Sequence, residues 1–367
     1  MPSPSRRRLL GAALATAGGL AAAPALACTR VLYRGSEETV VTGRSMDWME
    51  DMATDLWAFP AGMARDGAAG PDSPRWTARY GSVIAASYNI GTADGMNERG
   101  LVANLLYLAE SDYGAPAPGK PRLSITLWAQ YVLDSFATVA EAVAALRPEP
   151  FRIASPNLPN GKPATLHLSL SDASGDSAIL EYIDGRLVIH HGRDFTVMTN
   201  SPSYDQQLAV NRYWQDVGGM AFLPGTNRAA DRFARASFLL DAIPKVAAPG
   251  YIASVPGQAF GLQALASVLG VMRSVGVPLG ITTPDRPNIA STIWRTVADQ
   301  KNLVYGFDSA VRPNVFWVRL AALDLKPGAV ARKLPMAGGE VYAGEVSARF
   351  VPAAPFAFLG AEGHKPG

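Results

Sequence analysis

Residues 28–48 read CTRVLYRGSEETVVTGRSMDW, and this stretch sets how the fold begins. Two β-branched runs, at 29–34 and 39–45, flank the turn-forming residues GSEE. Strand-like runs joined by such a turn are typical of a β-hairpin. The sequence therefore predicts two adjacent antiparallel strands, with the chain's one cysteine directly before the first.

The remaining pattern predicts further runs of strands and runs of helices. Strands are expected around 76–108, in a β-meander from 165 to 199, and at 291–298, 301–307 and 314–323. Apolar residues recur every three or four positions, which predicts helices at 122–136, 138–146, 203–216, 229–243 and 258–275. Because strict βαβ alternation is missing, this order favours antiparallel sheets covered by helices.

Residues 1–27 have the three parts of a secretory signal. Arginines at 6–8 precede an apolar run rich in Ala and Gly, which ends in Ala-Leu-Ala at 25–27. The start, SRRRLL, resembles a twin-arginine export signal. A membrane anchor needs roughly 20 apolar residues, but the Ala/Gly content and the small-x-small triplet favour cleavage. We therefore expect a cleaved signal at 1–27, one domain at 28–367, a periplasmic location in a Gram-negative bacterium and no stable membrane insertion after cleavage.

The charge and the metal-ligand content of the chain exclude several classes of function. Without residues 1–27, the balance of basic to acidic residues falls from 33 against 31 to 30 against 31, because that segment holds three arginines and no acid. This balance gives no reason to expect a nucleic-acid partner. One cysteine cannot form an internal disulfide, and the four histidines lack zinc-site spacing. The acids of MDWMEDMATD, at 46–55, are interpreted as solvated loop residues and not as a metal site.

Cys28 has three interpretations. It can be a buried free cysteine that acts as a small core residue. It can be the acylated cysteine of a lipoprotein, although Ala25 stands where a lipobox usually has Leu. It can be a nucleophile exposed by cleavage, with its own α-amino group as the base. The pKa values of an α-amine, near ~8, and of a thiol, near ~8.5, suit proton exchange between them, and no obvious catalytic histidine is present.

Arg44 and Asp47 stand at the end of the predicted hairpin's second strand. Since a partner strand returns beside the first, both side chains are expected close to Cys28. A guanidinium group there favours the thiolate, and a carboxylate can hold the terminal ammonium group. The alternative interpretation of Arg44 and Asp47 is a surface ion pair.

Five separated motifs follow one another along the chain after residue 27. They are CTR at 28–30, GRSMDW at 43–48, ADGMNERGLVANLLYL at 93–108, MTNSPSYDQQ at 198–207 and ADRFARASF at 230–238. Together they resemble the cysteine N-terminal nucleophile hydrolases of the choloylglycine hydrolase family, which contains conjugated bile salt hydrolases and penicillin V acylases. The resemblance implies an α+β fold, a four-layer αββα sandwich of two antiparallel sheets.

The resemblance also implies a catalytic role for each matched residue. Cys28 matches the family nucleophile, and Arg44 and Asp47 match the arginine and aspartate that follow it. Asn200, together with the backbone or side chain of Tyr107, would help to stabilise the tetrahedral oxyanion. The neighbours of Asn200 alone would favour a turn before Ser-Pro. Arg232 matches the arginine of the family's SRF motif.

A few positions bear on the branch of the family. Tyr107 stands where bile salt hydrolases typically have Asn and penicillin V acylases have Tyr. Trp48 resembles the Gram-negative branch, whose members also cleave N-acyl homoserine lactones. Asp231 departs from the family's usual serine before Arg232, and the stretch LPGTNRAA departs from the Asp and Ser pattern of many relatives.

We therefore expect an exported amidase that hydrolyses a non-peptide C–N bond through a Cys28 thioester. Its substrate would be a small N-acyl amide such as penicillin V or an N-acyl homoserine lactone. No cofactor or metal is implied, and family precedent implies a homotetramer. The alternatives are a conjugated bile salt hydrolase and a lipid-anchored, non-catalytic binding protein. Five aromatic residues indicate either an apolar acyl pocket or plain core: Trp48, Trp57, Phe59, Tyr107 and Tyr113.

Overall fold

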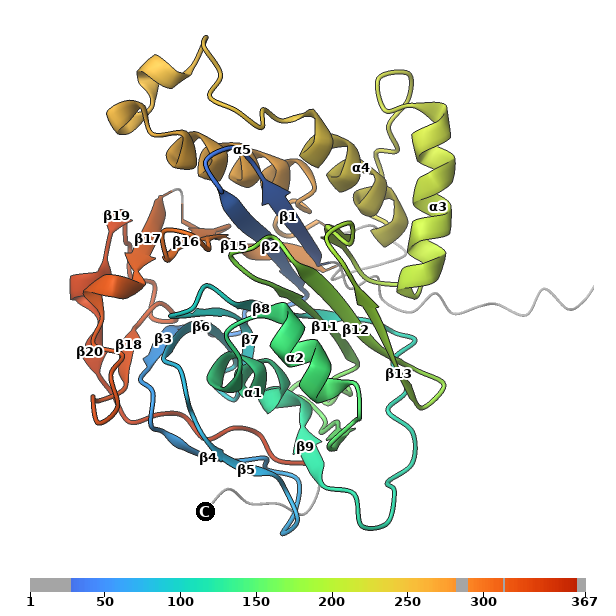
Figure 1. Cartoon of the computed structure of the whole chain (residues 1–367), viewed down its shortest axis with the longest axis vertical. Coiled ribbons are helices and arrows are strands. Elements are labelled where there is room, and N and C mark those ends of the chain that lie inside the picture. Colours follow the sequence, from blue (N-terminus) through green and yellow to red (C-terminus); the bar gives the residue numbers. More distant parts are fainter. Residues whose placement is uncertain (1–27, 282–289, 313, 362–367) are drawn as a thin grey trace, which may run out of the picture.

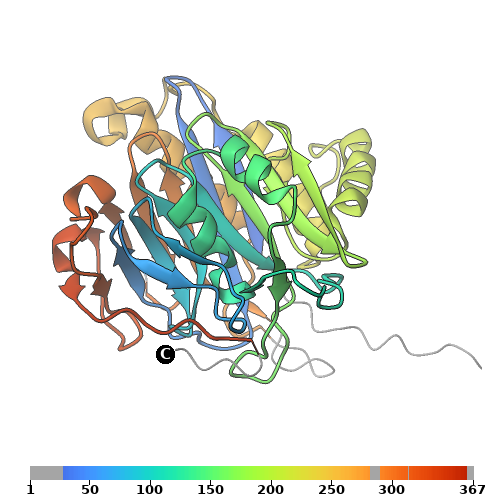
Figure 2. The same ribbon diagram turned by 60° about the horizontal axis from the view of Figure 1, so that its bottom comes forward.

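The computed structural model describes residues 28–281, 290–312 and 314–361, so the predicted export signal at 1–27 lies outside the described residues. Within those ranges, two large β-sheets lie face to face, and helices cover both outer sides (Figures 1 and 2). The predicted four-layer αββα sandwich is confirmed.

Most strands in the described part of the chain belong to the two large sheets. Sheet A contains, in spatial order, β14 (Val197–Met198), β1 (Thr29–Arg34), β2 (Val40–Trp48), β15 (Ser291–Asp299), β16 (Val304–Ser309), β17 (Val315–Arg319) and β19 (Gly344–Glu345). Sheet B contains β13 (Arg186–His191), β12 (Ser177–Ile183), β11 (Leu166–Ser171), β8 (Val102–Tyr107), β7 (Gly91–Asn97), β6 (Ser82–Ser87), β3 (Leu56–Phe59), β18 (Arg332–Leu334) and β20 (Val351–Pro352). Their neighbours are antiparallel except at the β17–β19 edge.

The helices form the two outer layers. Those on sheet B are α1 (Trp128–Ser135) and α2 (Val139–Leu146), and those on the side of sheet A are α3 (Tyr204–Val217), α4 (Ala229–Ala242) and α5 (Phe260–Ser274) (Figure 1). α4 packs on β1, α5 packs on β2 and β15, and α3 packs against α4. One large apolar cluster fills the space between the sheets and under α4 and α5, and a second lies between sheet B and α1.

Short elements complete the description. The parallel strands β9 (Arg122–Ser124) and β10 (Arg152–Ala154) and the antiparallel strands β4 (Ala64–Asp66) and β5 (Arg75–Thr77) form separate pairs. The 3₁₀ turns are Ile125–Leu127, Ile252–Ser254, Pro256–Gln258, Leu320–Ala322 and Ser347–Arg349.

The predicted hairpin is confirmed, and it is the centre of sheet A. β1 and β2 pair from Thr29 opposite Ser45 to Arg34 opposite Val40. β2 continues to Trp48 because β15 pairs with it on its other side. Cys28 therefore stands at the end of the sheet where β2 runs out, beside the residues of the GRSMDW motif.

Four of the predicted helices are confirmed within two residues at each end: 138–146, 203–216, 229–243 and 258–275. The local sequence explains where α2 begins. Thr138 is the N-cap, and its hydroxyl accepts a hydrogen bond from the Glu141 amide at 3.2 Å. The Glu141 carboxylate accepts one from the Ala137 amide at 2.9 Å, which resembles a capping box.

Two predicted elements were wrong in detail. The single helix expected at 122–136 is strand β9, a 3₁₀ turn and then α1, because residues 122–124 pair with 152–154. The strand expected as the last of the meander, β14, leaves sheet B and pairs with β1 in sheet A. Apolar periodicity indicates a strand but not which sheet it joins. This crossing brings the residues after β14 to Cys28.

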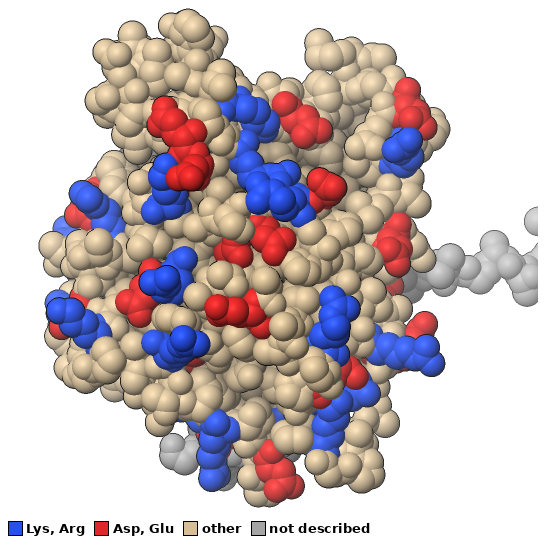
Figure 3. Space-filling view, in the orientation of Figure 1, with Lys and Arg blue, Asp and Glu red and all other residues tan. Residues whose placement is uncertain are grey.

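The surface seen in Figure 3 carries basic and acidic side chains interspersed, without a large field of one sign on this face. In the described ranges no helix is both long and apolar enough to cross a bilayer.

Gly43 allows α5 to lie close against β2. A Cβ atom added there would lie 2.8 Å from side-chain carbons of Met272 and Val268. We expect Gly43→Val to lower the free energy of unfolding by about 1–3 kcal/mol, because the helix must move away. Chemical denaturation measures this. As a control, an added Cβ at Gly270 on α5 meets no atom within 4 Å, so Gly270→Ala should not destabilise. Equal stability of Gly43→Val and the parent protein would contradict this packing.

Candidate active site

Cys28 lies directly before β1, and its side chain is only 2% exposed. Its Sγ atom is 3.9 Å from Met46 Sδ and 3.8 Å from the Asp47 carbonyl oxygen. Burial raises the pKa of the Cys28 thiol, and the nearby charges of Arg44 and Arg232 lower it by less. The positive charge of Arg44 lowers the thiol pKa, as predicted, but the effect of burial is larger. A thiol in this place therefore needs a base to become a nucleophile.

The main chain of Cys28 is held on both sides. Its nitrogen donates a hydrogen bond to Asn200 Oδ1 at 2.5 Å, and its carbonyl oxygen accepts one from Arg232 Nη1 at 2.6 Å. Arg232 Nη2 donates to the same Asn200 oxygen at 2.8 Å. Cys28, Asn200 and Arg232 thus form a closed ring of hydrogen bonds, and this ring fixes the position of the cysteine.

Arg232 reaches this ring from the first turns of α4, where its side chain is fully buried. Its Nη1 also donates to Thr29 Oγ1 at 2.5 Å, and its Nε donates to the Asn227 carbonyl at 3.1 Å. The departure from the family motif, Asp231, points elsewhere and accepts a hydrogen bond from Thr226. Asp231 therefore does not interrupt the contacts of Arg232.

Asn200 follows β14 and connects the ring to sheet B. Its Nδ2 donates to the carbonyl oxygen of Tyr107, the last residue of β8, at 2.6 Å. The carbonyl oxygen of Asn200 accepts a hydrogen bond from Gln207 Nε2 on α3 at 3.0 Å. An amide NH₂ group carries two hydrogens, so the Tyr107 carbonyl uses one of them and one remains.

Arg44 and Asp47 lie on opposite faces of β2, because they are three residues apart and strand side chains alternate. Asp47 faces the helices, with its Oδ2 atom 4.0 Å from Arg232 Nη1. Arg44 faces sheet B and donates to the Leu105 carbonyl at 2.9 Å. The expectation that both side chains face Cys28 therefore needs correction, since only Arg44 shares the inner face of the strand with the thiol.

Asp47 is fully buried, and burial raises the pKa of its carboxyl to about 6. The charge of Arg232 and a hydrogen bond from Thr292 act in the opposite direction. Thr292 Oγ1 donates to Asp47 Oδ1 at 2.6 Å. Among the described residues, Asp47 Oδ2 has no hydrogen-bond partner. Oδ1 is thus hydrogen-bonded to Thr292, whereas Oδ2 lies near Arg232, which donates to the Cys28 carbonyl.

Arg44 is the centre of a polar cluster between the two sheets. Its Nη1 lies 4.0 Å from Asp94 Oδ2, and its guanidinium carbon lies 4.6 Å from the centre of the Trp294 ring. Asp94 also accepts hydrogen bonds from Asn104 Nδ2, at 2.5 Å, and from the Tyr305 hydroxyl. A buried cation needs such partners. Asp94 and Trp294 contact Arg44 directly, and Asn104 and Tyr305 hold the Asp94 carboxylate.

An apolar pocket opens at Cys28, and both predicted substrate-binding residues, Trp48 and Tyr107, line it. The other walls are mainly aliphatic and thioether side chains: Met46, Met52, Ile90, Leu105, Leu158 and Leu166. The Trp48 indole donates to the Tyr88 hydroxyl at 2.7 Å, which fixes its ring.

The remaining aromatic residues of the proposed acyl pocket, Trp57, Phe59 and Tyr113, do not line it. Trp57 and Phe59 pack with Phe356 in the core under sheet B. The Tyr113 hydroxyl is bound to the Leu166 backbone. These three side chains are therefore part of the core and not of the acyl pocket.

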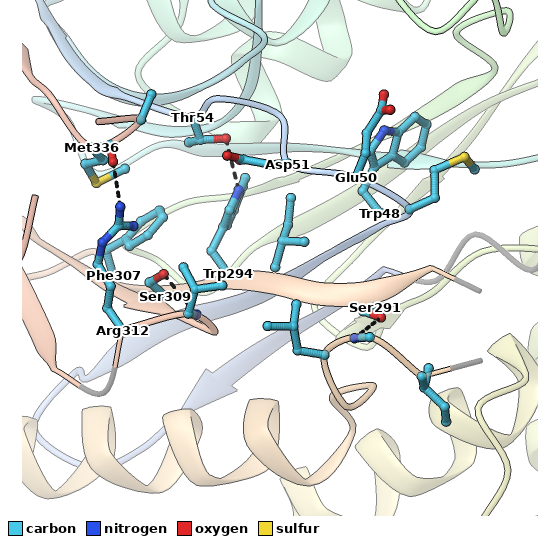
Figure 4. A pocket seen from close by; sticks show the side chains of 17 residues that line it. Trp48, Glu50, Asp51, Thr54, Ser291, Trp294, Phe307, Ser309, Arg312 and Met336 are labelled. Carbon is cyan, nitrogen blue, oxygen red and sulfur yellow. Dashed lines mark hydrogen bonds between the residues drawn. The ribbon is translucent and has the colours of Figure 1, made fainter. Parts of the chain in front are cut away.

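A second cavity, of about 400 Å³, shares Trp48 with the first (Figure 4). Its walls combine the aromatic rings of Trp294 and Phe307 with the hydroxyls of Thr54 and Ser309. Figure 4 shows Arg312 at the end away from Trp48, where it donates to the Met336 carbonyl at 2.8 Å. This cavity can accept a group with both apolar and polar parts.

His167 and Glu181 support the site but were not predicted from the sequence. Each ring nitrogen of His167 lies 2.9 Å from an acceptor, one on Glu181 and one the carbonyl of Thr199. Glu181 also accepts the amide hydrogen of Tyr204 at the start of α3, at 3.0 Å. The only hint in the sequence was that His167 lies in a strand of alternating residues, at a position that faces inward. Its partners are 14 and 32 residues away, which no local pattern indicates.

Removal of the Arg232 guanidinium should cost much stability. We expect Arg232→Leu to lower the free energy of unfolding by about 3–5 kcal/mol, because Asp47 loses its buried cationic partner and the acceptors on Cys28 and Asn200 lose their donor. Chemical denaturation compares it with Arg235→Leu. Arg235 is on the same helix and donates to two loop carbonyls, so its loss should cost only about 1 kcal/mol. Equal losses in the two variants would contradict a special role for Arg232.

Comparison with known proteins agrees with this geometry. Residues 28–332 match the family described as linear amide C–N hydrolases, choloylglycine hydrolase family. The chain is 49% identical over 360 residues to a penicillin V acylase from Pectobacterium atrosepticum, with 93% of this chain and 94% of the relative covered.

Solved structures give the same result. The penicillin V acylase from Agrobacterium tumefaciens is 54% identical, with a TM-score of 0.82 over 91% of this chain and 100% of the other. A conjugated bile acid hydrolase variant from Clostridium perfringens shares the fold at 20% identity, with a TM-score of 0.69 over 84% and 97% of the two chains. The chain therefore belongs to the choloylglycine hydrolase family, and it is a linear amide C–N hydrolase with the N-terminal nucleophile hydrolase fold.

Proposed function

We propose that this protein is an exported acylase that hydrolyses an N-acyl amide, such as penicillin V or an N-acyl homoserine lactone, through a Cys28 thioester. The observation that carries the proposal is the position of Cys28. Its thiol lies at an apolar pocket, while its main-chain nitrogen and carbonyl are held by Asn200 and Arg232. The identity to two penicillin V acylases supports this choice of substrate class.

The proposal includes cleavage of the export signal after Ala27. The nitrogen that donates to Asn200 Oδ1 would then be an α-amino group next to the thiol. An amide nitrogen has almost no basicity at neutral pH, whereas an α-amine has a pKa near ~8. Because burial raises the pKa of the Cys28 thiol, this amine supplies the base that the thiol needs.

In the acylation step, Cys28 Sγ attacks the substrate carbonyl carbon and its proton passes to the α-amine. The second hydrogen of Asn200 Nδ2 and a donor on Tyr107, either its main-chain N–H or its side-chain hydroxyl, stabilise the tetrahedral oxyanion. The C–N bond then breaks, and the α-ammonium group returns its proton to the leaving amine. The product of this step is an acyl thioester on Cys28.

In the deacylation step, the α-amine takes a proton from water, and the resulting hydroxide attacks the thioester carbonyl. The C–S bond breaks, the carboxylic acid leaves and the proton returns to the Cys28 sulfur. Asp47 keeps the ammonium form of the terminus in place through its carboxylate charge. Only substrate and water are consumed, because the Cys28 thiol and the α-amine are regenerated.

The two cavities suit the two halves of such a substrate. We place the acyl group in the apolar pocket between Trp48 and Tyr107, where burial of a phenoxy ring or an alkyl chain is favourable. The amine half would extend past Trp48 toward the second cavity with its hydroxyl and charged groups.

Substrate preference tests this assignment. We expect penicillin V and long-chain N-acyl homoserine lactones to be hydrolysed faster than glycine- or taurine-conjugated bile salts, because Tyr107 replaces the Asn typical of bile salt hydrolases and the chain is about half identical to two penicillin V acylases. Side-by-side assays of the released amine measure kcat/KM for each. A clear preference for bile salts would overturn the acylase assignment in favour of a bile salt hydrolase.

The N-terminus tests the mechanism. Cys28→Ala should fold and lose amide hydrolysis, and a form that keeps Ala27 should also fold but show no turnover, since its nitrogen is an amide. Intact mass of the exported protein should give a chain that begins at an unmodified Cys28. A diacylglycerol adduct would instead support the lipoprotein alternative, and full turnover with Ala27 in place would exclude the N-terminal base.

A further inference from the structure

We propose that Thr292 is a positioning residue of this active site, whose hydroxyl group holds the Asp47 carboxylate in the orientation that serves Cys28. The inference rests on the mechanism under "Proposed function", in which Asp47 holds the Cys28 terminus. Thr292 lies 264 residues from Cys28 in the sequence and belongs to none of the five motifs.

A β-bulge in β15 places the Thr292 side chain. Thr292 pairs with Asp47, but Trp294 pairs with Met46, so Ile293 is an extra residue. In a regular strand, residues 292 and 294 would lie on one face. The bulge lets Thr292 share the outer face with Asp47 while Trp294 stacks on Arg44 between the sheets. Bulges beside active sites commonly re-aim a side chain in this way.

The Thr292 hydroxyl group accepts one hydrogen bond and donates its own hydrogen to Asp47. The amide of Val277 donates to Thr292 Oγ1 at 2.8 Å, and the Val277 carbonyl accepts the Thr292 amide hydrogen at 3.0 Å. Since Oγ1 already accepts a hydrogen bond, its own hydrogen points to Asp47 Oδ1, at 2.6 Å. A fully buried hydroxyl has one hydrogen to give, so this bond favours a carboxylate over a carboxylic acid.

This arrangement gives the two oxygens of Asp47 different tasks. Oδ1 is held by Thr292, whereas Oδ2 lies 4.0 Å from Arg232 Nη1, the atom that also donates to the Cys28 carbonyl. Within the described ranges Oδ2 is buried and makes no hydrogen bond. The carboxylate therefore presents its unoccupied oxygen toward Arg232, which holds the Cys28 main chain.

The same contact affects the titration of Asp47. Burial raises its pKa to about 6, and the Thr292 hydroxyl lowers it together with Arg232 on α4, Arg44 on β2 and Arg295 on β15. The Cys28 thiol also interacts electrostatically with the Asp47 carboxylate. Activity that needs the ionised carboxylate is lost as the pH falls through about 6. Without the Thr292 hydroxyl the pKa rises further, so this loss occurs at higher pH.

The test compares three variants of the mature enzyme with penicillin V as the substrate. Thr292→Val removes the hydroxyl at nearly constant volume, and Thr292→Ser keeps it. Thr42→Val is the matched control. Thr42 is a buried threonine on β2, five residues from Asp47, whose hydroxyl bonds to Ser171 and Gln300. Thermal unfolding of each variant shows which of them fold.

We expect Thr292→Val to reduce kcat by about 10-fold at neutral pH with little change in KM. The acid limb of its kcat/KM profile should move about one pH unit upward. Thr292→Ser should restore the rate within about threefold and return the limb to its original pH. Thr42→Val should lose stability and keep the original profile.

Three results would overturn the inference: an unshifted acid limb in Thr292→Val, an equal defect in Thr292→Ser, or the same shift in Thr42→Val. If Thr292→Val does not fold, Thr292→Cys replaces it, because a thiol is a weak donor and should shift the limb part of the way. An unshifted limb in that variant would also overturn it. The parent enzyme distinguishes the two hypotheses: its failure to cleave any N-acyl amide would refute the proposed function, whereas cleavage by the parent with an unshifted acid limb in Thr292→Val would refute only the role of Thr292.

Discussion

The buried guanidinium group of Arg232 is the interaction on which the rest of the site depends. A cation without solvent needs charged or polar partners, and Arg232 finds them on Cys28, Thr29 and Asn200, with Asp47 4.0 Å away. These partners come from the start of β1, the end of β14 and the end of β2. The arginine therefore holds α4 over sheet A and fixes the main chain of Cys28, while the thiol itself faces the pocket.

The crossing of the chain from sheet B to sheet A is the second constraint. β12 and β13 extend sheet B, and β14 then pairs with β1. Because of this crossing, Asn200 contacts both layers, with Cys28 on one side and the Tyr107 carbonyl on the other. His167 and Glu181 hold the turn that follows β14 from beneath. The oxyanion-stabilising group of the proposed reaction is thus positioned by contacts between sheets.

The polar cluster around Arg44 has a comparable role inside the sandwich. Arg44 from sheet A approaches Asp94 of sheet B, and the Tyr305 hydroxyl from sheet A also donates to that carboxylate. Burial raises the pKa of Asp94, while the positive charge of Arg44 acts against this. Apolar faces alone would allow the two sheets to slide, whereas directional hydrogen bonds allow few relative positions. The cluster therefore fixes Arg44, which lines the Cys28 pocket.

The sequence by itself determined the hairpin at 29–45, most helices and the family, because turn residues, periodicity and the five motifs are each local signals. The sequence-based prediction placed both Arg44 and Asp47 beside Cys28, although their spacing of three positions on one strand already implies opposite faces. Only the tertiary structure decided that β14 joins sheet A and that Thr292 meets Asp47, which is 245 residues away. Such contacts depend on strand order and on a one-residue bulge, and neither leaves a periodic pattern in the sequence, because pairing partners are chosen by the packing of the whole fold.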